Sequence, residues 1–169
     1  MNSVFNIFVS KPNALTSDQS IFYSEFLKLI GERSLIPRTL GETDFPNNAP
    51  IHAVRDLLLQ CDGVIVLGFR QTFIEIGFSK FETQKQFVID KSYLPTAWNQ
   101  IEAGMAFMCN VPMLIICENG VTSGVFDVGN TDKFIHQTSL SRDWLHSKKF
   151  LQPFNSWHME LIQKQALNT

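Results

Sequence analysis

Two kinds of hydrophobic pattern alternate along the chain. Short apolar runs rich in valine, isoleucine and phenylalanine are typical of buried strands, whereas apolar residues repeated every three or four positions are typical of amphipathic helices. The apolar runs predict strands at 4–10, 34–40, 62–69, 112–118 and 133–140. The repeating segments predict helices at 16–33, 51–61, 96–109 and 155–167.

Strands and helices follow one another in turn, and the inner strands are apolar without a polar alternation. Such strands are typical of parallel sheets that helices cover on both faces. The pattern therefore predicts an α/β fold, a three-layer open parallel sheet of about five strands in flavodoxin-like order. Pro37 cannot donate a backbone hydrogen bond, so we expect 34–40 at a sheet edge. A length of 169 residues suits one domain over 1–169.

Residues 70–94 interrupt this alternation between the third strand and the third helix. The connection is much longer than the roughly 2–6 residues usual at this point of an α/β fold. It carries five aromatic residues, Phe73, Phe78, Phe81, Phe87 and Tyr93. A long aromatic loop that leaves the carboxyl end of a central strand lies where open α/β sheets bind ligands. The alternative is a packed excursion that completes the core or forms an oligomer contact, and the sequence leaves both open.

Composition and charge narrow the classes of function. Apolar residues make up 44% of the chain and charged residues 18%, with a net charge of −2. The longest basic run is Lys148-Lys149, so we expect no nucleic-acid partner. A helix needs about 18 apolar residues to span a membrane, and no apolar run in the chain approaches that length. We therefore expect no segment that crosses a membrane. The four histidines and Cys61, Cys109 and Cys117 show no metal-binding spacing, and the cysteines suit a reduced, cytoplasmic protein.

One carboxylate stands out in the third predicted helix. Glu102 is the only charged residue between Trp98 and Cys117. One interpretation is structural, because Asn99 as N-cap would form an Asn99-x-x-Glu102 capping box worth about 1 kcal/mol. The other interpretation is chemical. Small residues nearby leave room for a ligand or a close-packed neighbour, and Trp98 lies one turn earlier on the same helical face. A carboxylate beside an aromatic ring suits a developing positive charge or a glycosyl-enzyme bond.

The residues around Glu102 resemble two known families. The stretch WNQIEAGMAF, followed by VPMLII, resembles the nucleoside 2-deoxyribosyltransferases, whose corresponding helix carries a nucleophilic glutamate in an E-x-G-x-A setting. Glu102, Gly104 and Ala106 match that motif. The spacing Trp98-x-x-x-Glu102 is also similar to the catalytic helix of TIR (Toll/interleukin-1 receptor) domains, whose enzymatic members cleave the nicotinamide–ribose bond of NAD. The resemblance covers roughly residues 4–127 in the order of elements.

Two departures from the deoxyribosyltransferase pattern bear on the expected reaction. That family places an aspartate after the third strand to hold the base, where this chain reads LGF at 67–69. It also places Asp-x-Gly before the nucleophile, where this chain reads TAW at 96–98. Base exchange between deoxynucleosides is therefore not expected, and cleavage of an N-glycosidic bond is what the resemblance implies.

Polar residues at the carboxyl ends of the predicted strands complete the expected site. Ser10 and Lys11 follow the first strand, where contacts to ribose or phosphate are usual, although Lys11 also suits a solvated loop. Arg70 ends the central strand and either faces the same crevice or forms a salt bridge within the insert. Asn99 suits a ribose hydroxyl or a helix cap, and Asp127 a pocket rim or a turn. The predicted site comprises Glu102 as the catalytic residue and Ser10, Lys11, Arg70, Trp98, Asn99 and Asp127 as substrate-binding residues.

The expected function is cleavage of the N-glycosidic bond of NAD or a related nucleotide or nucleoside through Glu102. No separate cofactor and no metal are expected, because NAD would be consumed as the substrate. The family resemblance implies a bacterial nucleotide-signalling or phage-defence setting. A surplus of aromatic residues in 70–94 and around Trp144, Phe150 and Phe154 predicts a homo-oligomer. The alternative is a TIR-like module that senses a nucleotide or assembles without catalysis.

Overall fold

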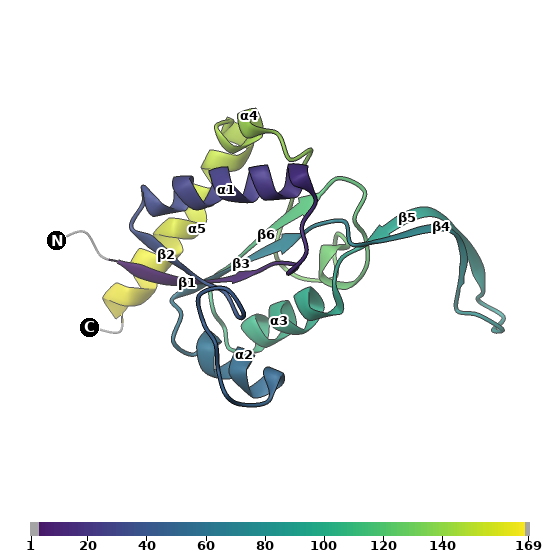
Figure 1. The fold of residues 1–169 in the computed structure, drawn as a ribbon, viewed down its shortest axis with the longest axis horizontal. Helices are drawn as coiled ribbons and strands as arrows, with labels where there is room; N and C mark the ends of the chain where they lie inside the picture. Colours follow the sequence, from purple (N-terminus) through teal and green to yellow (C-terminus); the bar gives the residue numbers. More distant parts are fainter. Residues whose placement is uncertain (1–3, 168–169) are drawn as a thin grey trace.

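Five parallel strands form the central sheet of the protein (Figure 1). The structure is a computed structural model that describes residues 4–167. In sheet order the strands are β2 (Leu35–Arg38), β1 (Phe5–Ser10), β3 (Gly63–Gly68), β6 (Met113–Glu118) and β7 (Ile135–Thr138). Every neighbouring pair is parallel, and β2, which contains Pro37, lies at an edge. The predicted α/β fold with a sheet of about five parallel strands is confirmed.

Helices cover both faces of this sheet and make three layers (Figure 1). One face carries α1 (Ser17–Gly31), α4 (Arg142–Leu145) and α5 (Lys148–Leu167). The other face carries α2 (Pro50–Leu58) and α3 (Ala97–Met108). Successive residues of a strand point to opposite faces. Consequently β1 contributes Phe5, Ile7 and Val9 to the core beneath α1 and α5, and Phe8 to the core beneath α2 and α3.

The closing helix begins earlier than the sequence predicts. α5 starts at Lys148 rather than at 155 and continues through Pro153, a residue that disfavours a helix interior. Phe150 and Phe154 lie one turn apart and are both buried, with 5.2 Å between their stacked ring centres. This packing outweighs the backbone hydrogen bond lost at the proline. Although α5 has 20 residues, neither it nor another helix in the described part of the chain combines the length and apolar character needed to cross a membrane.

Residues 70–94 form a β-hairpin that projects from the body, and the expectation of a loop is wrong (Figure 1). β4 (Thr72–Ser79) and β5 (Phe87–Leu94) pair antiparallel as a separate two-stranded sheet. Both strands are rich in β-branched and aromatic residues, which favour extended backbone. At the base, Tyr93 forms an isolated bridge with Val121 of the loop after β6. We call residues 72–94 the arm.

Candidate functional site

The order of the strands reverses between β1 and β3. The sheet continues from β1 to β2 on one side, and from β3 through β6 to β7 on the other. Open α/β sheets bind ligands in the crevice outside the carboxyl ends of the strands at such a switch point. Ser10 is the last residue of β1 and Gly68 is the last residue of β3. α3 packs against both strands, so its first turns form the setting of the candidate site.

Three polar side chains are buried together at this point. Ser10 comes from the end of β1, whereas Asn99 and Glu102 come from the first two turns of α3. Their residues are 1%, 0% and 8% exposed, respectively. Asn99 Nδ2 donates to Ser10 Oγ at 2.8 Å, and the Ser10 side chain is a hydrogen-bond partner of the Glu102 carboxyl. We call these three residues the Ser10–Asn99–Glu102 cluster.

α3 begins at Ala97 because Thr96 caps it. The Thr96 backbone is extended, with φ −73° and ψ 152°, and its Oγ1 accepts from the Asn99 amide at 3.1 Å. Asn99 is therefore the third residue of the helix, and the interpretation of Asn99 and Glu102 as a capping box is wrong. The physical reason is that the Asn99 side chain points inward, where its two polar atoms bond to Thr96 and Ser10.

The hydrogen bonds of the cluster run in one direction. Thr96 Oγ1 donates to Asn99 Oδ1 at 2.8 Å, and Asn99 Nδ2 donates to Ser10 Oγ at 2.8 Å. The Ser10 side chain also acts on Glu102, since its hydroxyl lowers the pKa of that carboxyl. This chain of neutral donors orients the Glu102 carboxyl without supplying a positive charge.

Burial and the lack of a counter-charge set the pKa of Glu102. Desolvation raises the pKa of Glu102 to about 7, and the hydrogen bond from Ser10 acts in the opposite direction. No Lys, Arg or His within residues 4–167 forms an ion pair with this carboxyl. Buried carboxyl groups without a cation are energetically unfavourable and concentrate at functional sites. Near neutral pH such a group can exchange a proton or, once ionised, face a positive charge.

Trp98 lies one turn before Glu102 on α3 but outside the buried cluster. Trp98 is 44% exposed, so its side chain lies at the surface. The small residues after Glu102 serve different purposes. Ala103 and Ala106 are buried in the core against the sheet, whereas a Cβ added at Gly104 would meet nothing within 4 Å. α3 therefore lies close to the sheet along one side and is open to a neighbour at Gly104.

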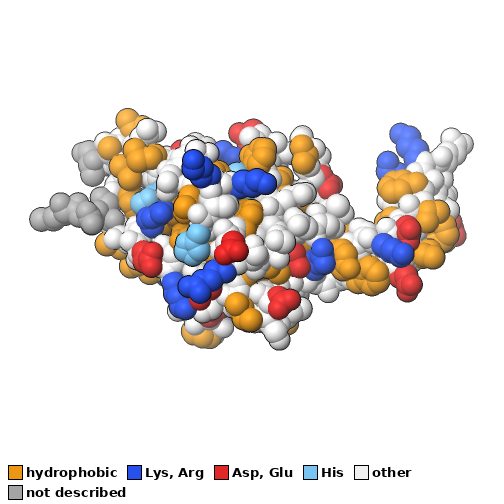
Figure 2. Space-filling view, turned by 90° about the horizontal axis from the view of Figure 1, so that it is seen from above, with side chains coloured by type: hydrophobic (Ala, Val, Ile, Leu, Met, Phe, Trp, Pro, Cys, Tyr) orange, Lys and Arg blue, Asp and Glu red, His pale blue; other side chains and the backbone are white. Residues whose placement is uncertain are grey.

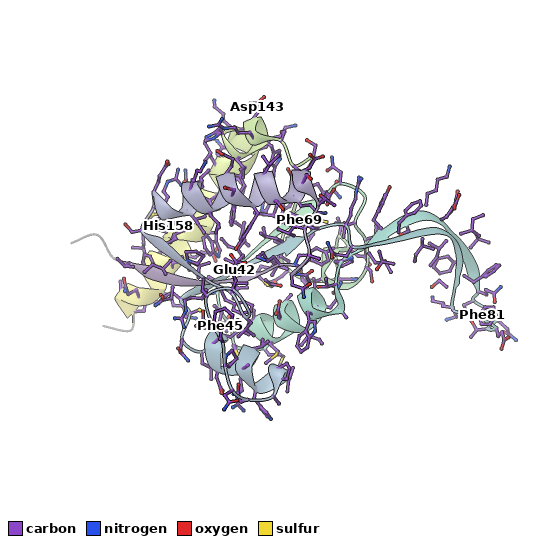
Figure 3. The ribbon with its side chains drawn as sticks, in the orientation of Figure 1. Glu42, Phe45, Phe69, Phe81, Asp143 and His158 are labelled. Carbon is purple, nitrogen blue, oxygen red and sulfur yellow. The ribbon has the colours of Figure 1, made fainter. Side chains whose placement is uncertain are left out.

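Lys11 is bound by the chain itself. Its Nζ lies 2.8 Å from Glu42 Oε2 and 5.0 Å from the centre of the Tyr23 ring, and its side chain is nearly fully buried. Glu42 belongs to the loop after β2 (Figure 3). Tyr23 donates its hydroxyl proton to Glu42 Oε1 at 3.3 Å, and burial together with the Glu42 carboxylate raises the pKa of Tyr23. The alternative of a solvated lysine is wrong, and phosphate binding by Lys11 would require this ion pair to open.

Arg70 lies at the base of the arm, on the side of the sheet that carries α1. Its guanidinium stacks on Tyr93 at 4.2 Å from the ring centre, and its Nε donates to the Asn119 carbonyl at 2.8 Å. The same Nε lies 3.5 Å from Glu118 Oε1, so the salt bridge is made with β6 and not within the insert. Gln19 of α1 also donates to Glu118, at 2.9 Å. These residues line a groove of ≈ 580 Å³ beside α1, apart from the cluster.

Asp127 forms a turn in the loop after β6. Its Oδ1 accepts from the Ser123 amide at 2.7 Å, as in the turn alternative. Gln100 of α3 holds the same loop, because its Oε1 accepts from the Val125 amide at 2.9 Å and its Nε2 donates to the Ser123 carbonyl at 3.0 Å. The sequence gives no sign of this role, since the partners of Gln100 lie 23 and 25 residues away. The loop after β6 is thereby fixed to the start of α3.

Only some of the predicted site residues lie close to one another in the structure. Ser10, Asn99 and Glu102 lie together, while Lys11, Arg70, Trp98 and Asp127 have other surroundings. Thr96 was not predicted as part of the site, although a threonine three residues before Asn99 is a recognisable cap signal. Across residues 4–167, no three His, Cys, Asp or Glu side chains gather so as to hold a metal ion. The chemistry of the cluster is that of one carboxyl, one hydroxyl and one amide.

Sequence comparison adds no family to this picture, since no protein-family model matches the chain and no curated protein matches it with significant similarity. The likeness of the Glu102 motif to deoxyribosyltransferases and TIR domains therefore stays an expectation. What supports a function for this chain is the geometry of the Ser10–Asn99–Glu102 cluster.

Proposed function

We propose that the protein cleaves the N-glycosidic bond of NAD or a related nucleotide or nucleoside, with Glu102 as the catalytic residue. The observation that supports this proposal is a buried carboxyl without an ion-pair partner, grouped with Ser10 and Asn99 at the switch point of the sheet. Breaking a ribosyl C1′–N bond leaves positive charge on the sugar, in an oxocarbenium-like species. Ionised Glu102 in a water-poor setting is suited to stabilise that charge or to attack the carbon.

The buried groups favour NAD over an ordinary nucleoside as the substrate. The bond electrons leave with the base, and the sugar carbon gains a bond to water or to Glu102. In NAD the nicotinamide starts as a pyridinium cation and departs neutral, so its departure needs no acid. The base of an ordinary nucleoside is normally protonated as it leaves, which calls for a second acidic group. Glu102 is the only Asp or Glu within residues 4–167 that is buried, so the cluster supplies no such partner.

Ser10 and Asn99 act in this proposal as positioning residues. The Ser10 hydroxyl opposes the effect of burial on the pKa of Glu102, which keeps a fraction of the carboxyl ionised near neutral pH. Asn99 fixes the orientation of that hydroxyl. Trp98, exposed on the same helix, is available to stack on a bound ring. Lys11 and Arg70 would contact phosphate only after leaving their present carboxylate partners.

The proposed setting is the cytoplasm, where NAD is available and thiols stay reduced. Cys61, Cys109 and Cys117 are all free. Burial raises the pKa of Cys61 and of Cys117 to about 12, so both thiols are poorly reactive. A role in bacterial defence or nucleotide signalling follows from the family resemblance alone.

The test is to incubate the protein with NAD, nicotinamide mononucleotide and a panel of nucleosides, and to measure free nicotinamide or free base by chromatography. Wild type should release nicotinamide, and Glu102→Gln should do so far more slowly. Glu160→Gln changes an exposed carboxyl on α5 and should match wild type. If wild type at high concentration releases nothing from any of these compounds, the proposal is refuted.

A nucleotide-sensing or assembly module without catalysis is the second candidate, and the arm is the observation that favours it. Large exposed apolar side chains are typical of interaction surfaces. Calorimetry separates the two functions. Saturable binding of NAD without release of nicotinamide would assign the cluster to sensing, whereas binding with turnover would assign it to catalysis.

A further inference from the structure

The two edges of the central sheet differ in the backbone groups that they leave open. β2 forms one edge and β7 forms the other. In a parallel ladder, every second residue of a strand bonds to a given neighbour, and the residues between point their amides and carbonyls the other way. The Phe5 amide donates to the Ser34 carbonyl at 3.1 Å. Leu35 and Pro37 of β2 therefore point away from β1. Pro37 has no amide hydrogen, and a proline at such a position blunts a sheet edge.

The β7 edge has no such block. The Asn119 amide donates to the Thr138 carbonyl at 2.9 Å, so Thr138 faces β6. By the same alternation, Ile135 and Gln137 point their amides and carbonyls away from the sheet. Within residues 4–167, no group outside the sheet bonds to the backbone of these two residues. Open amides and carbonyls at alternate positions match the backbone of an added extended strand.

A groove of ≈ 530 Å³ lies beside this edge, and we call it the β7 groove. The rings of Phe134 and His136 form part of its wall, with 4.8 Å between their centres. Trp144 of α4 forms another part and packs on Phe150, whose ring centre lies 4.9 Å away. Figure 2 looks onto the face that carries α4 and shows hydrophobic side chains beside basic ones there. Side chains of a strand alternate in direction, so every second side chain of an added strand would enter this aromatic groove.

The charged side chains that line the β7 groove are both basic. They are Lys133 and Lys149, and no Asp or Glu of residues 4–167 is among the lining residues. In this part of the chain Lys149 forms no ion pair, and Lys133 pairs only with Asp132, an exposed residue 3.9 Å away. Burial lowers the pKa of His136, so its ring is neutral near pH 7. The two lysines attract acidic side chains, and they repel the same edge of a second copy.

We propose that the β7 edge binds an extended segment of a partner protein that carries large apolar and acidic residues. The partner backbone pairs with the amides and carbonyls of Ile135 and Gln137, its apolar side chains enter the β7 groove, and its carboxylates approach the two lysines. β7 has four residues and spans about 13 Å, so the contact is short. The affinity should accordingly be weak, with a Kd of roughly 10–100 μM. This inference does not rest on the proposed catalysis.

Fluorescence anisotropy with a labelled peptide, Glu-Glu-Phe-Val-Phe-Glu-Glu, tests the proposal on the full chain. Wild type should bind it in the range given above, and the peptide with lysine in place of each glutamate should bind at least about tenfold more weakly. Gln137→Pro removes an outward amide at a sheet edge, where proline is tolerated, and should also weaken binding about tenfold. Gln137→Ala keeps that amide and should bind as wild type does. No binding by wild type up to about 1 mM, or equal binding by the two Gln137 variants, would overturn the proposal.

Charge reversal gives a second test that leaves the strand unchanged, in case Gln137→Pro does not fold. Lys133→Glu/Lys149→Glu should weaken binding of the acidic peptide by about tenfold. The control Lys80→Glu/Lys148→Glu makes the same change in net charge at exposed lysines outside the groove, and it should bind within about twofold of wild type. Equal weakening by the two double variants would show attraction to the overall charge and overturn the proposal.

Hydrogen exchange followed by NMR separates strand addition from binding by side chains alone. The bound peptide should slow exchange of the Ile135 and Gln137 amides, because both become hydrogen-bonded. Binding that leaves these two amides unchanged would overturn the proposal. Sedimentation velocity covers the other occupant of the edge. A wild-type dimer that is lost in Gln137→Pro and kept in Gln137→Ala would assign the edge to a second copy, which also overturns it.

Discussion

Glu102→Gln separates the stability of the fold from the chemistry of the buried carboxyl. In the folded protein the pKa of Glu102 is raised from 4.5 to about 7 by burial, whereas the unfolded chain keeps the ordinary value. The folded state therefore holds the proton more tightly, and the stability of wild type falls as pH rises from about 4.5 through about 7. Each pKa unit corresponds to about 1.4 kcal/mol, so ionisation destabilises wild type by about 3 kcal/mol near pH 8.

Glutamine has nearly the same volume as glutamate and carries no charge. Its amide oxygen still accepts from the Ser10 hydroxyl, in a weaker bond that costs about 1 kcal/mol. Glu102→Gln should therefore be about 2 kcal/mol more stable than wild type near pH 8. In a chain of 169 residues this is a rise in Tm of about 4–8 °C. Near pH 4, where the carboxyl of wild type is protonated in both states, the stabilisation should disappear.

Turnover should move in the opposite direction. If the carboxylate stabilises the oxocarbenium by ~3–4 kcal/mol, its removal lowers kcat roughly 10²–10³-fold. Wild-type activity should rise with pH through about 7, because the ionised form is the active one. The assays are calorimetric melting near pH 4 and pH 8, and nicotinamide release across the same range. Equal melting of wild type and variant at both pH values would refute the burial argument, and equal turnover would remove Glu102 from the mechanism.

Three further substitutions test the surroundings of Glu102. Ser10→Ala removes the hydroxyl that lowers the pKa of Glu102, so this pKa should rise further. The acid limb of the pH profile of kcat/KM should then move to higher pH. A limb that does not move would contradict the effect of Ser10 on Glu102. Gly68→Ala would drive a Cβ into the Phe126 ring and should lower the free energy of unfolding by about 1–3 kcal/mol in urea. Gly104→Ala meets open space and should stabilise α3 by up to about 1 kcal/mol, so equal changes at the two glycines would contradict the packing.

The central strands could be predicted because both of their faces are apolar. In β3 every residue from Val64 to Leu67 is fully buried, and the sequence shows this as an unbroken apolar run between turn residues. The arm gives no comparable signal. Its strands carry apolar residues on both faces although they are exposed, and the turn at 80–86 contains no glycine, asparagine or aspartate. Burial within the described fold therefore does not explain the apolar pattern of the arm.

The sequence predicts where the site residues lie along the sheet. It does not predict which side chains they form hydrogen bonds or ion pairs with. The rule that ligands meet the carboxyl ends of strands identified Ser10, and the motif identified Glu102. The bond between Ser10 and Asn99 spans 89 residues, so it follows only from the packing of α3 on the sheet. Lys11 and Arg70 were placed at the correct edge, yet their carboxylate partners come from loops and strands far along the chain. A sequence fixes where a long side chain starts and leaves its direction to the tertiary structure.

The charges along the carboxyl edge of the sheet bear on which ligand the cluster accepts. The cations there are already matched by carboxylates, in the pairs Lys11–Glu42, Arg38–Asp44 and Arg70–Glu118. None of these three is held open for a phosphate, so anion binding gives the site little of its selectivity. Glu102 differs from the carboxylates in these three pairs. Burial opposes the ionisation of Glu102, and no cation within residues 4–167 lies beside it to favour the charged form. A ligand that brings positive charge beside this carboxyl lowers its pKa and is stabilised in return. On the proposed function, the sugar of NAD supplies that charge as the bond to nicotinamide breaks.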